Sequence, residues 1–232
     1  MKSRKIALSS ELAYVLSVLL IALAVAMASA ADFGLSMIVA PAYLVSQWLG
    51  LISFGQAEYL VQGLLFVVLC VALRRFRPIY LVSFGTGLFY GAVLDFWRSV
   101  LPLLNPALTP PDTLSLGLRI GLFVLAEALT GLAIALCFRT YIYPQVYDFF
   151  VTAITGRYGI STVRFKRAFD LGMLLLALGL SLLLFRGLVG IGIGTVIMAL
   201  CNSAVIGFFL RLLERHVDIH PRFPRLAEKF RL

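Results

Sequence analysis

The chain has 232 residues, of which 61% are apolar and 13% are charged, and its formal net charge is +9. A mean hydropathy of +0.99 excludes an ordinary soluble domain, which needs a polar surface and carries about 25% charged residues. The positive charge does not indicate nucleic-acid binding, because the basic residues cluster at the ends of apolar runs and no soluble domain remains to contact a groove.

The apolar runs predict membrane-spanning helices. About 17 to 25 apolar residues cross the hydrocarbon core as a helix, which satisfies its own backbone hydrogen bonds. The runs are continuous and do not alternate with polar residues, so they do not predict the strands of a barrel. We therefore expect an all-α polytopic membrane protein of about six transmembrane helices. The expected spans are 11–31, 58–74, 79–97, 116–138, 169–185 and 188–212.

The first of these spans has an alternative interpretation. Basic residues at 2–5, an apolar core and the small residues Ala28-Ser29-Ala30 together resemble a secretory signal with its cleavage site. We interpret 11–31 as a retained span, because its removal would leave five spans and would break the internal repeat described below.

Two segments between spans are irregular. Residues 33–57 and 140–167 each follow the first span of one half of the chain, and each contains a short apolar piece bounded by glycine or proline. We expect interfacial or partly re-entrant helices here, since irregular backbone at membrane depth has to be covered by protein or has to line a water-filled cavity.

The basic residues predict the orientation of the chain. With six spans, four basic groups fall on one side of the membrane, which the positive-inside rule assigns to the cytoplasm together with both termini. We expect the basic tail, residues 213–232, to lie on the cytoplasmic membrane surface. The four groups are Lys2, Arg4 and Lys5; Arg74, Arg75 and Arg77; Arg139, Arg157, Arg164, Lys166 and Arg167; and Arg215, Arg222, Arg225, Lys229 and Arg231.

A shift of 112 residues aligns the second half of the chain on the first. We expect an N-terminal three-helix repeat at 1–112 and a C-terminal one at 113–212, and the odd number of spans makes the second repeat inverted. Inverted repeats recur in secondary transporters, which bind their substrates between the repeats, although proteins that transport nothing also contain them. The aligned residues include Glu58 with Asp170, Arg74 with Arg186, and Gly91 with Ser203.

Several short motifs occur in an order that resembles a known family. In the first half they are Gly34-Leu35-Ser36, Ser53-Phe54-Gly55-Gln56, Arg74-Arg75-Phe76-Arg77-Pro78-Ile79 and Gly91-Ala92-Val93-Leu94-Asp95; in the second half they are Lys166-Arg167-Ala168-Phe169-Asp170, Gly190 and Gly194-Thr195. Over residues 12–212 the chain resembles the YczE/YitT-like family of small bacterial membrane proteins. The resemblance implies an integral protein of the bacterial inner membrane and implies no substrate. Ser203 departs from the pattern, which has glycine there.

Glu127 is the sharpest candidate for a functional residue. It lies near the middle of the fourth span, where a carboxylate costs about 2.5 to 3.5 kcal/mol on insertion scales and faces a cavity or a partner. One interpretation is a proton-coupling or cation-binding acid. The other is a structural acid, protonated or paired with Arg119 or Arg186.

The remaining polar residues of the spans have both structural and functional interpretations. Glu58 and Asp170 are expected to begin equivalent helices, where the helix dipole favours negative charge, and Asp170 is four residues from Lys166. Asp95 and Arg98 are three residues apart and predict a local ion pair, with gating as the alternative. Buried amides join helices or line cavities, and two are candidates for substrate or ion binding: Gln62 and Asn202.

No catalytic or metal site can be assembled from the sequence. The cysteines 70, 137 and 201 lie singly within spans, and the histidines 216 and 220 lie in the tail without a third ligand. We predict no enzyme activity, cofactor or metal. The leading hypothesis is a small transporter, monomeric or homodimeric, that binds a small polar solute or ion between its halves. The alternatives are a substrate-binding subunit of a larger transporter and a membrane scaffold or regulator that binds protein partners.

Overall fold

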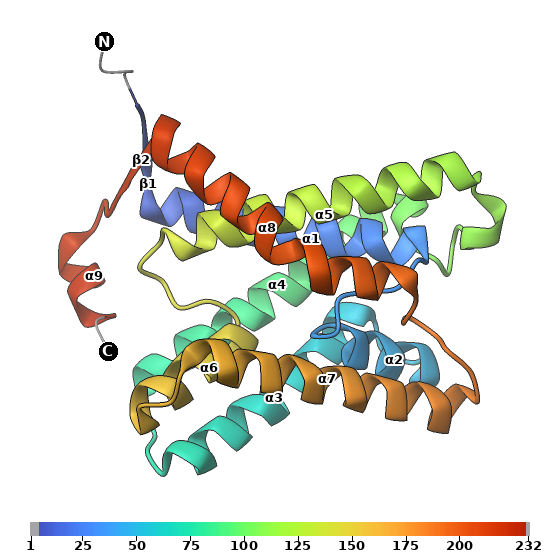
Figure 1. The fold of residues 1–232 in the computed structure, drawn as a ribbon, viewed down its shortest axis with the longest axis horizontal. Helices are drawn as coiled ribbons and strands as arrows, with labels where there is room; N and C mark the ends of the chain where they lie inside the picture. Colours follow the sequence, from blue (N-terminus) through green and yellow to red (C-terminus); the bar gives the residue numbers. More distant parts are fainter. Residues whose placement is uncertain (1–4, 231–232) are drawn as a thin grey trace.

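The computed structural model describes residues 5–230, in which six helices are long and apolar enough to cross a membrane, as predicted (Figure 1). These six are α1 (Ser10–Ala31), α3 (Phe54–Leu73), α4 (Leu81–Val100), α5 (Leu116–Phe138), α7 (Thr162–Phe185) and α8 (Ile193–His216). The shorter elements are helices α2 (Ala40–Leu49), α6 (Val146–Tyr158) and α9 (Pro224–Lys229), the 3₁₀ turns Pro78–Tyr80, Pro102–Leu104 and Pro111–Thr113, and the strands β1 (Ile6–Ser9) and β2 (Val217–His220). The prediction of an all-α polytopic fold is confirmed.

Local signals set the ends of the long helices. The Ser53 side chain accepts a hydrogen bond from the backbone of Gln56, whose side chain accepts from the Ser53 N–H, so a capping box begins α3. Arg74 and Arg186 end α3 and α7 in the left-handed conformation, with φ of 47° and 54°. The two predicted arginine ends are therefore equivalent helix caps.

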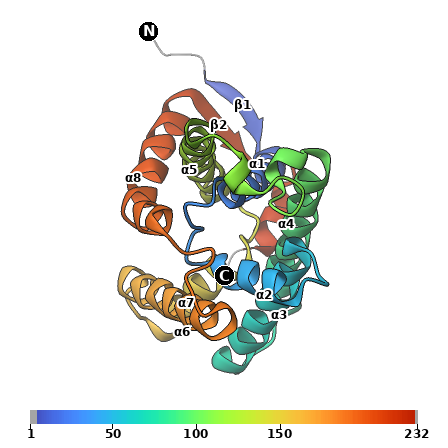
Figure 2. The same cartoon turned by 90° about the vertical axis from the view of Figure 1, so that its right-hand side faces the viewer.

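The eight helices that surround the centre form two bundles (Figures 1 and 2). In the first bundle α1 packs along α5 and α4, and α5 packs along α8. In the second bundle α3 packs on α2 and α6, and α7 packs on the same two short helices. Each bundle therefore takes equivalent helices from both halves of the sequence, and the predicted boundaries 1–112 and 113–212 describe a sequence repeat rather than two separate packing units.

The two halves have the same order of elements and run in opposite directions. Each half has a long helix, a short helix and two more long helices, and Figure 1 shows that corresponding long helices point opposite ways along the molecule. Equivalent hydroxyl groups support the repeat. Ser83 of α4 donates to the Pro144 carbonyl at 2.8 Å, and Thr195 of α8, 112 residues later, donates to the Leu35 carbonyl at 2.7 Å. Each hydroxyl therefore holds the irregular segment of the opposite half.

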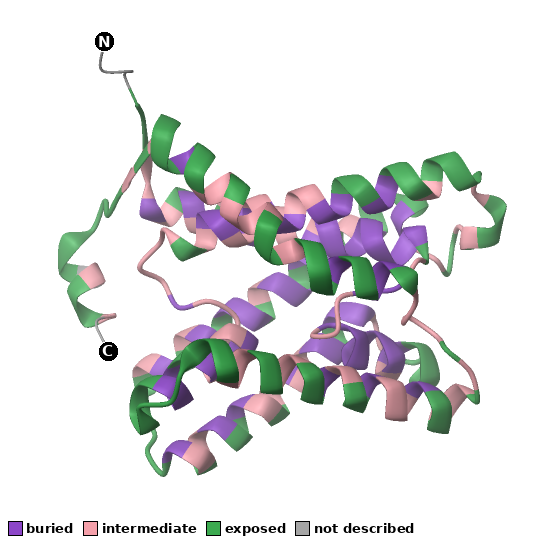
Figure 3. Cartoon of the chain, viewed as in Figure 1, coloured by how far each residue is buried: buried purple, intermediate pink, exposed green. Residues whose placement is uncertain are grey.

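The first span is central to this arrangement. α1 is the most buried of the six spanning helices, and Figure 3 shows its buried residues along most of its length. Ala22, Ala26 and Ala30 are fully buried, and these small residues let neighbouring backbones approach closely. The main hydrophobic core is built around α1.

The two bundles meet along two helix pairs, α3–α4 and α7–α8, and these two seams differ. On one side α3 and α4 pack closely through glycines: a Cβ atom added to Gly55 would lie 2.1 Å from the Gly91 carbonyl oxygen, and one added to Gly87 would lie 2.3 Å from Gln62 Oε1. On the other side the equivalent helices α7 and α8 make no extended contact within the described residues. The equivalent helix pairs of the two halves therefore differ: α3 and α4 are in close contact, whereas α7 and α8 are not.

The tail pairs with the N-terminal end of the described chain, and its predicted position on the membrane surface stays a prediction. α8 continues to His216, and β2 then pairs in parallel with β1, so the tail joins the N-terminal strand of the described chain. Phe230 packs edge-to-face on Tyr141 and Tyr143, at ring-centroid distances of 5.5 and 5.2 Å. The strand pairing was not predicted, because four-residue strands far apart in sequence carry little periodic signal.

The Thr195 hydrogen bond gives a first testable prediction. We expect Thr195→Val to lower the free energy of unfolding by about 0.6 to 1.7 kcal/mol, the range measured for hydrogen bonds between membrane helices. Unfolding of the detergent-solubilised protein by a denaturing detergent measures it. Thr109→Val is the control, because no side-chain hydrogen bond of Thr109 is found in the described residues. Equal stability of the two variants would contradict the structural role of Thr195.

Candidate functional site

A cavity of about 650 Å³ lies between the two bundles, beside the open α7–α8 seam. This volume is within the usual range of small-molecule sites. Its wall combines α1, α5 and α8 of one bundle with α6 and α7 of the other, and the irregular residues 35–39 complete it. Irregular backbone therefore lines a cavity, as the sequence predicted for such segments at membrane depth.

The internal repeat gives this cavity a counterpart. Three residues that line it align by the 112-residue shift with the three glycines that close the α3–α4 seam. Glycine allows the closest approach of two helices, and none of the three aligned residues is glycine. The cavity is thus the second-half counterpart of a closed helix contact. The aligned pairs are Gly55 with Arg167, Gly87 with Ala199, and Gly91 with Ser203.

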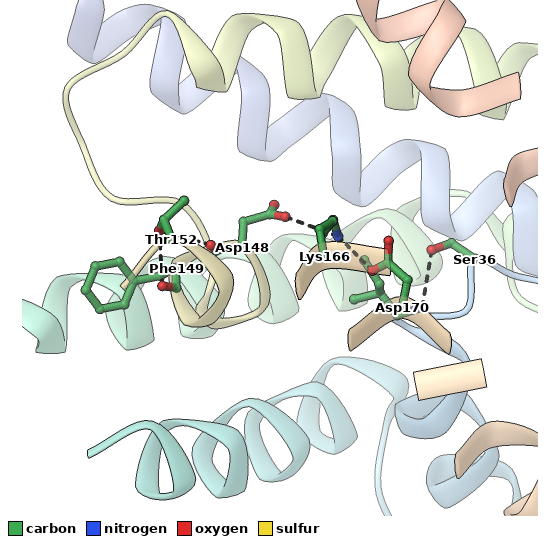
Figure 4. A network of polar contacts seen from close by, with 7 residues as sticks. Ser36, Asp148, Phe149, Thr152, Lys166 and Asp170 are labelled. Carbon is green, nitrogen blue, oxygen red and sulfur yellow. Dashed lines mark hydrogen bonds and ion pairs between the residues drawn. The ribbon is translucent and has the colours of Figure 1, made fainter. Parts of the chain in front are cut away.

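A charged cluster lies on the α6–α7 side of the cavity (Figure 4). Lys166 Nζ lies 2.8 Å from Asp170 Oδ1 and 3.7 Å from Asp148 Oδ1, and all three residues line the cavity. The predicted pairing of Lys166 with Asp170 is confirmed. Ser36, from the irregular segment of the first half, points toward Asp170 (Figure 4). The cluster therefore presents both signs of charge to the cavity, and Ser36 of the first half lies next to it.

A second polar cluster is buried behind the cavity wall. Glu58 of α3 is 0% exposed, and its Oε2 accepts hydrogen bonds from Tyr147 Oη at 2.9 Å and from Gln62 Nε2 at 3.1 Å. Gln62 also donates to Gln145 Oε1 at 3.1 Å. Burial is the main cause that raises the pKa of Tyr147 well above its ordinary value, so this hydroxyl remains a donor. Tyr147 and Gln145 line the cavity, whereas Gln62 and Glu58 lie behind them.

The expected role of Glu58 and Asp170 as helix-starting acids is wrong. α3 begins at Phe54, so Glu58 lies one turn inside the helix, and α7 begins at Thr162, so Asp170 lies two turns inside. The prediction placed both helix starts too late, because it relied on apolar content and the first turns of the two helices contain polar residues. Both acids face the interior and the opposite half instead.

Glu127 lies buried on α5, as predicted, but without a partner. Neither of its carboxyl oxygens has a hydrogen-bond partner among the described residues, and it does not line the cavity, although Thr130 one turn later does. The predicted pairing with Arg119 is not formed. Arg119 donates to the Ala31 carbonyl at 2.9 Å and lies 3.4 Å from Asp32.

The two predicted amides occupy different positions. Asn202 of α8 lines the cavity, and its buried Oδ1 has no partner among the described residues. Its position at the cavity wall leaves the predicted role in solute binding a prediction. Gln62 is fully buried, and its contacts to Glu58, Gln145 and the Val146 N–H use its donor and acceptor atoms. Gln62 therefore supports the cavity wall and does not face a solute.

Asp95 and Arg98 do not form the predicted ion pair. The Asp95 carboxylate accepts hydrogen bonds from the Ser53 hydroxyl and from the Gly55 N–H, so it caps the N-terminus of α3. Arg98 donates to Asn105 Oδ1 at 3.1 Å and lies over the ring of Phe54. The spacing of three residues suggested a local pair, whereas the tertiary contacts provide each charge with a different partner.

Four residues of the site were missed in the sequence: Asp148, Tyr90, Gln145 and Tyr147. All four line the cavity, and Tyr90 Oη is a buried polar atom without a partner among the described residues. The irregular segment 140–167 contains three of them, but its pattern gives no reason to choose Tyr147. In the part of the chain that the structure describes, no group of three or more histidine, cysteine or acidic residues could hold a metal ion.

Six apolar helices and a charged cavity between two bundles define a polytopic helical membrane protein with an internal site. The chain belongs to a protein family of unknown function, DUF6198, whose model matches residues 8–211. Comparisons with curated proteins and with solved structures gave no match. The narrower resemblance to the YczE/YitT-like family stays a prediction.

Proposed function

We propose that this protein is a small transporter that binds a small polar solute in the cavity between its two bundles. The observation that carries the proposal is the charged cluster of Asp148, Lys166 and Asp170 at the wall of a cavity of about 650 Å³. Asp170 lies two turns inside the spanning helix α7, and charged side chains within spans are costly and mark substrate or ion pathways in membrane proteins.

The lining suits a solute that carries both polar and apolar groups. Lys166 and Arg167 offer donors, Asp148 and Asp170 offer acceptors, and Asn202 has a free acceptor atom. Apolar side chains face this polar side of the cavity from three helices: Ile21 and Val25 of α1, Ile134 of α5, and Met198 and Ile206 of α8. Such a site holds a small zwitterion or a monovalent charged solute better than a fully hydrated ion.

The arrangement of the helices supports transport over a scaffold role. The site lies between two bundles that each contain helices of both inverted repeats, and it is lined by residues of both repeats. Secondary transporters with inverted repeats bind their substrates where the repeats meet. The positive-inside rule supports an orientation in which both termini and the charged end of α7 face the cytoplasm of the bacterial inner membrane. Glu127 remains a candidate for the coupling charge, although its position behind the wall makes Asp170 the better candidate for direct contact.

The proposal is tested by ligand-dependent thermal stability in detergent, with amino acids, small amines and small carboxylic acids as probes. We expect at least one probe to stabilise the wild-type protein, because binding to the folded state alone contributes about 2.7 kcal/mol at 100 times Kd. Asp170→Asn and Asn202→Leu are expected to lose this stabilisation. Asp112→Asn, in an exposed 3₁₀ turn, is the matched control and should keep it.

A stabilising probe should then enter proteoliposomes that contain the wild-type protein and not those with Asp170→Asn. Failure of every probe, or stabilisation that persists in both cavity variants, would overturn the proposal. The scaffold alternative would then be tested by deleting residues 221–232, which removes α9 and leaves the β1–β2 pair in place.

A further inference from the structure

We propose that Glu58 is a proton-binding site that exchanges its proton with the cavity across Tyr147. Glu58 is completely buried in a membrane-spanning helix, and a single side chain, Tyr147, both donates to its carboxyl group and lines the cavity. The site itself stands on these contacts alone, whereas any role in uptake rests on the proposed function.

The hydrogen bonds of Glu58 are unequal. Tyr147 and Gln62 both donate to Oε2, whereas Oε1 is buried and has no partner among the described residues. An ionised carboxylate has two equivalent acceptor oxygens, and leaving one of them buried and unsolvated is costly. A proton on Oε1 lowers this cost, because it removes the buried charge. The observed pattern, two donors on one oxygen and none on the other, therefore fits a neutral carboxylic acid.

No neighbouring charge stabilises the ionised form of Glu58. The groups found around it are neutral: Tyr147 of α6 and Gln62 of α3 donate to its carboxyl group, and Tyr90 of α4 lies close to it. The nearest buried cation on α4, Arg98, is directed to Asn105 and to the Phe54 ring. No salt bridge to Glu58 is found in the described residues.

The route to the cavity is short. Tyr147 stands between Glu58 and the cavity, and Tyr90, whose buried hydroxyl also has no partner, lines the cavity from α4. A tyrosine hydroxyl both donates and accepts, so Tyr147 can pass a proton by accepting one on its oxygen as it releases its own. For release, the carboxyl group turns so that its protonated oxygen faces Tyr147 and gives its proton to the Tyr147 oxygen. The Tyr147 hydroxyl gives its own proton to water or solute in the cavity, and uptake is the reverse.

The inverted repeat gives this site a counterpart. Asp170, 112 residues after Glu58, lines the cavity directly and is paired with Lys166. One half therefore holds a carboxylate with a cation, and the other holds a carboxyl group without one. The same position in the repeat thus serves solute contact in one half and proton storage in the other.

Infrared difference spectroscopy at neutral pH tests the proposal, because only a protonated carboxyl group gives a carboxylic acid C=O band. Glu127→Gln is the reference protein, since the unpartnered Glu127 would contribute a band of its own. In this background we expect a C=O band that is lost on adding Glu58→Gln and that shifts in heavy water. Adding Tyr147→Phe should move the band to higher frequency, since a hydrogen bond to the carboxyl group is removed.

Tyr158→Phe is the control for the tyrosine variant, because Tyr158 donates to the Ala72 carbonyl and not to Glu58. Two results would overturn the proposal: a band that is unchanged by Glu58→Gln, or no such band in the reference protein. Both readouts are independent of uptake. If the band is assigned to Glu58 but the protein moves no solute, the proton-binding site is supported and the transport function is rejected.

Discussion

Replacement of Gly55 by leucine is expected to lower the stability of the folded protein by about 3 kcal/mol or more. A Cβ at this position would lie 2.1 Å from the Gly91 carbonyl oxygen and 2.6 Å from an Asp95 carboxylate oxygen. The first of these atoms belongs to the backbone and cannot rotate away. The second belongs to the side chain that caps α3, so a shift of Asp95 also removes the cap. The contact that joins the two bundles would have to separate.

The measurement is unfolding of the purified protein by a denaturing detergent, followed by helical circular dichroism. Gly179→Leu is a matched control, because Gly179 also lies in a spanning helix and has open space around the added Cβ. We expect this variant to unfold like the wild type. If Gly55→Leu is equally stable, α3 and α4 do not pack as described.

A water-soluble, charged thiol reagent is expected to label Ser203→Cys at least about tenfold faster than Leu183→Cys. Ser203 lines the cavity, whereas Leu183 of α7 is 81% exposed and does not line it. Thiol reagents react with the thiolate, which forms in water and not in lipid. The comparison is made after replacement of the native cysteines 70, 137 and 201, of which the last is exposed beside the cavity.

The same labelling tests the predicted orientation. In vesicles that expose the side of the two termini, we expect Ser203→Cys to react with a reagent that cannot cross the membrane. Equal, slow labelling at both positions would mean that lipid and not water fills the space between α7 and α8. Fast labelling only from the opposite side would reverse the predicted access of the cavity.

Much of the fold could be predicted from the sequence because the bilayer imposes strong constraints. Apolar length located all six spans, and the repeat predicted the equivalent arginine caps at Arg74 and Arg186. The helix starts at Phe54 and Thr162 were placed too late, since their first turns carry polar residues that an apolar count discards. The two short strands were not predicted, because they lie outside every expected span.

The candidate site was predictable only in part. Asn202 and Asp170 were correctly singled out and line the cavity, because a polar residue in an apolar span is conspicuous. Glu127 is equally conspicuous, but which face of a helix meets a cavity depends on its neighbours. Tyr147 was missed because tyrosine is common in interfacial segments, and only the tertiary structure brings it to Glu58.

The attachment of α8 at both ends constrains how the cavity can close. Its N-terminal end is held where the Gly194 N–H donates to the Phe33 carbonyl at 2.7 Å, and its C-terminal end continues into β2, paired with β1. Both anchors belong to the bundle that contains α1. α8 therefore cannot swing alone onto α7. We therefore expect any closure of the cavity to bring the two bundles together, with the glycine-lined α3–α4 contact as the hinge.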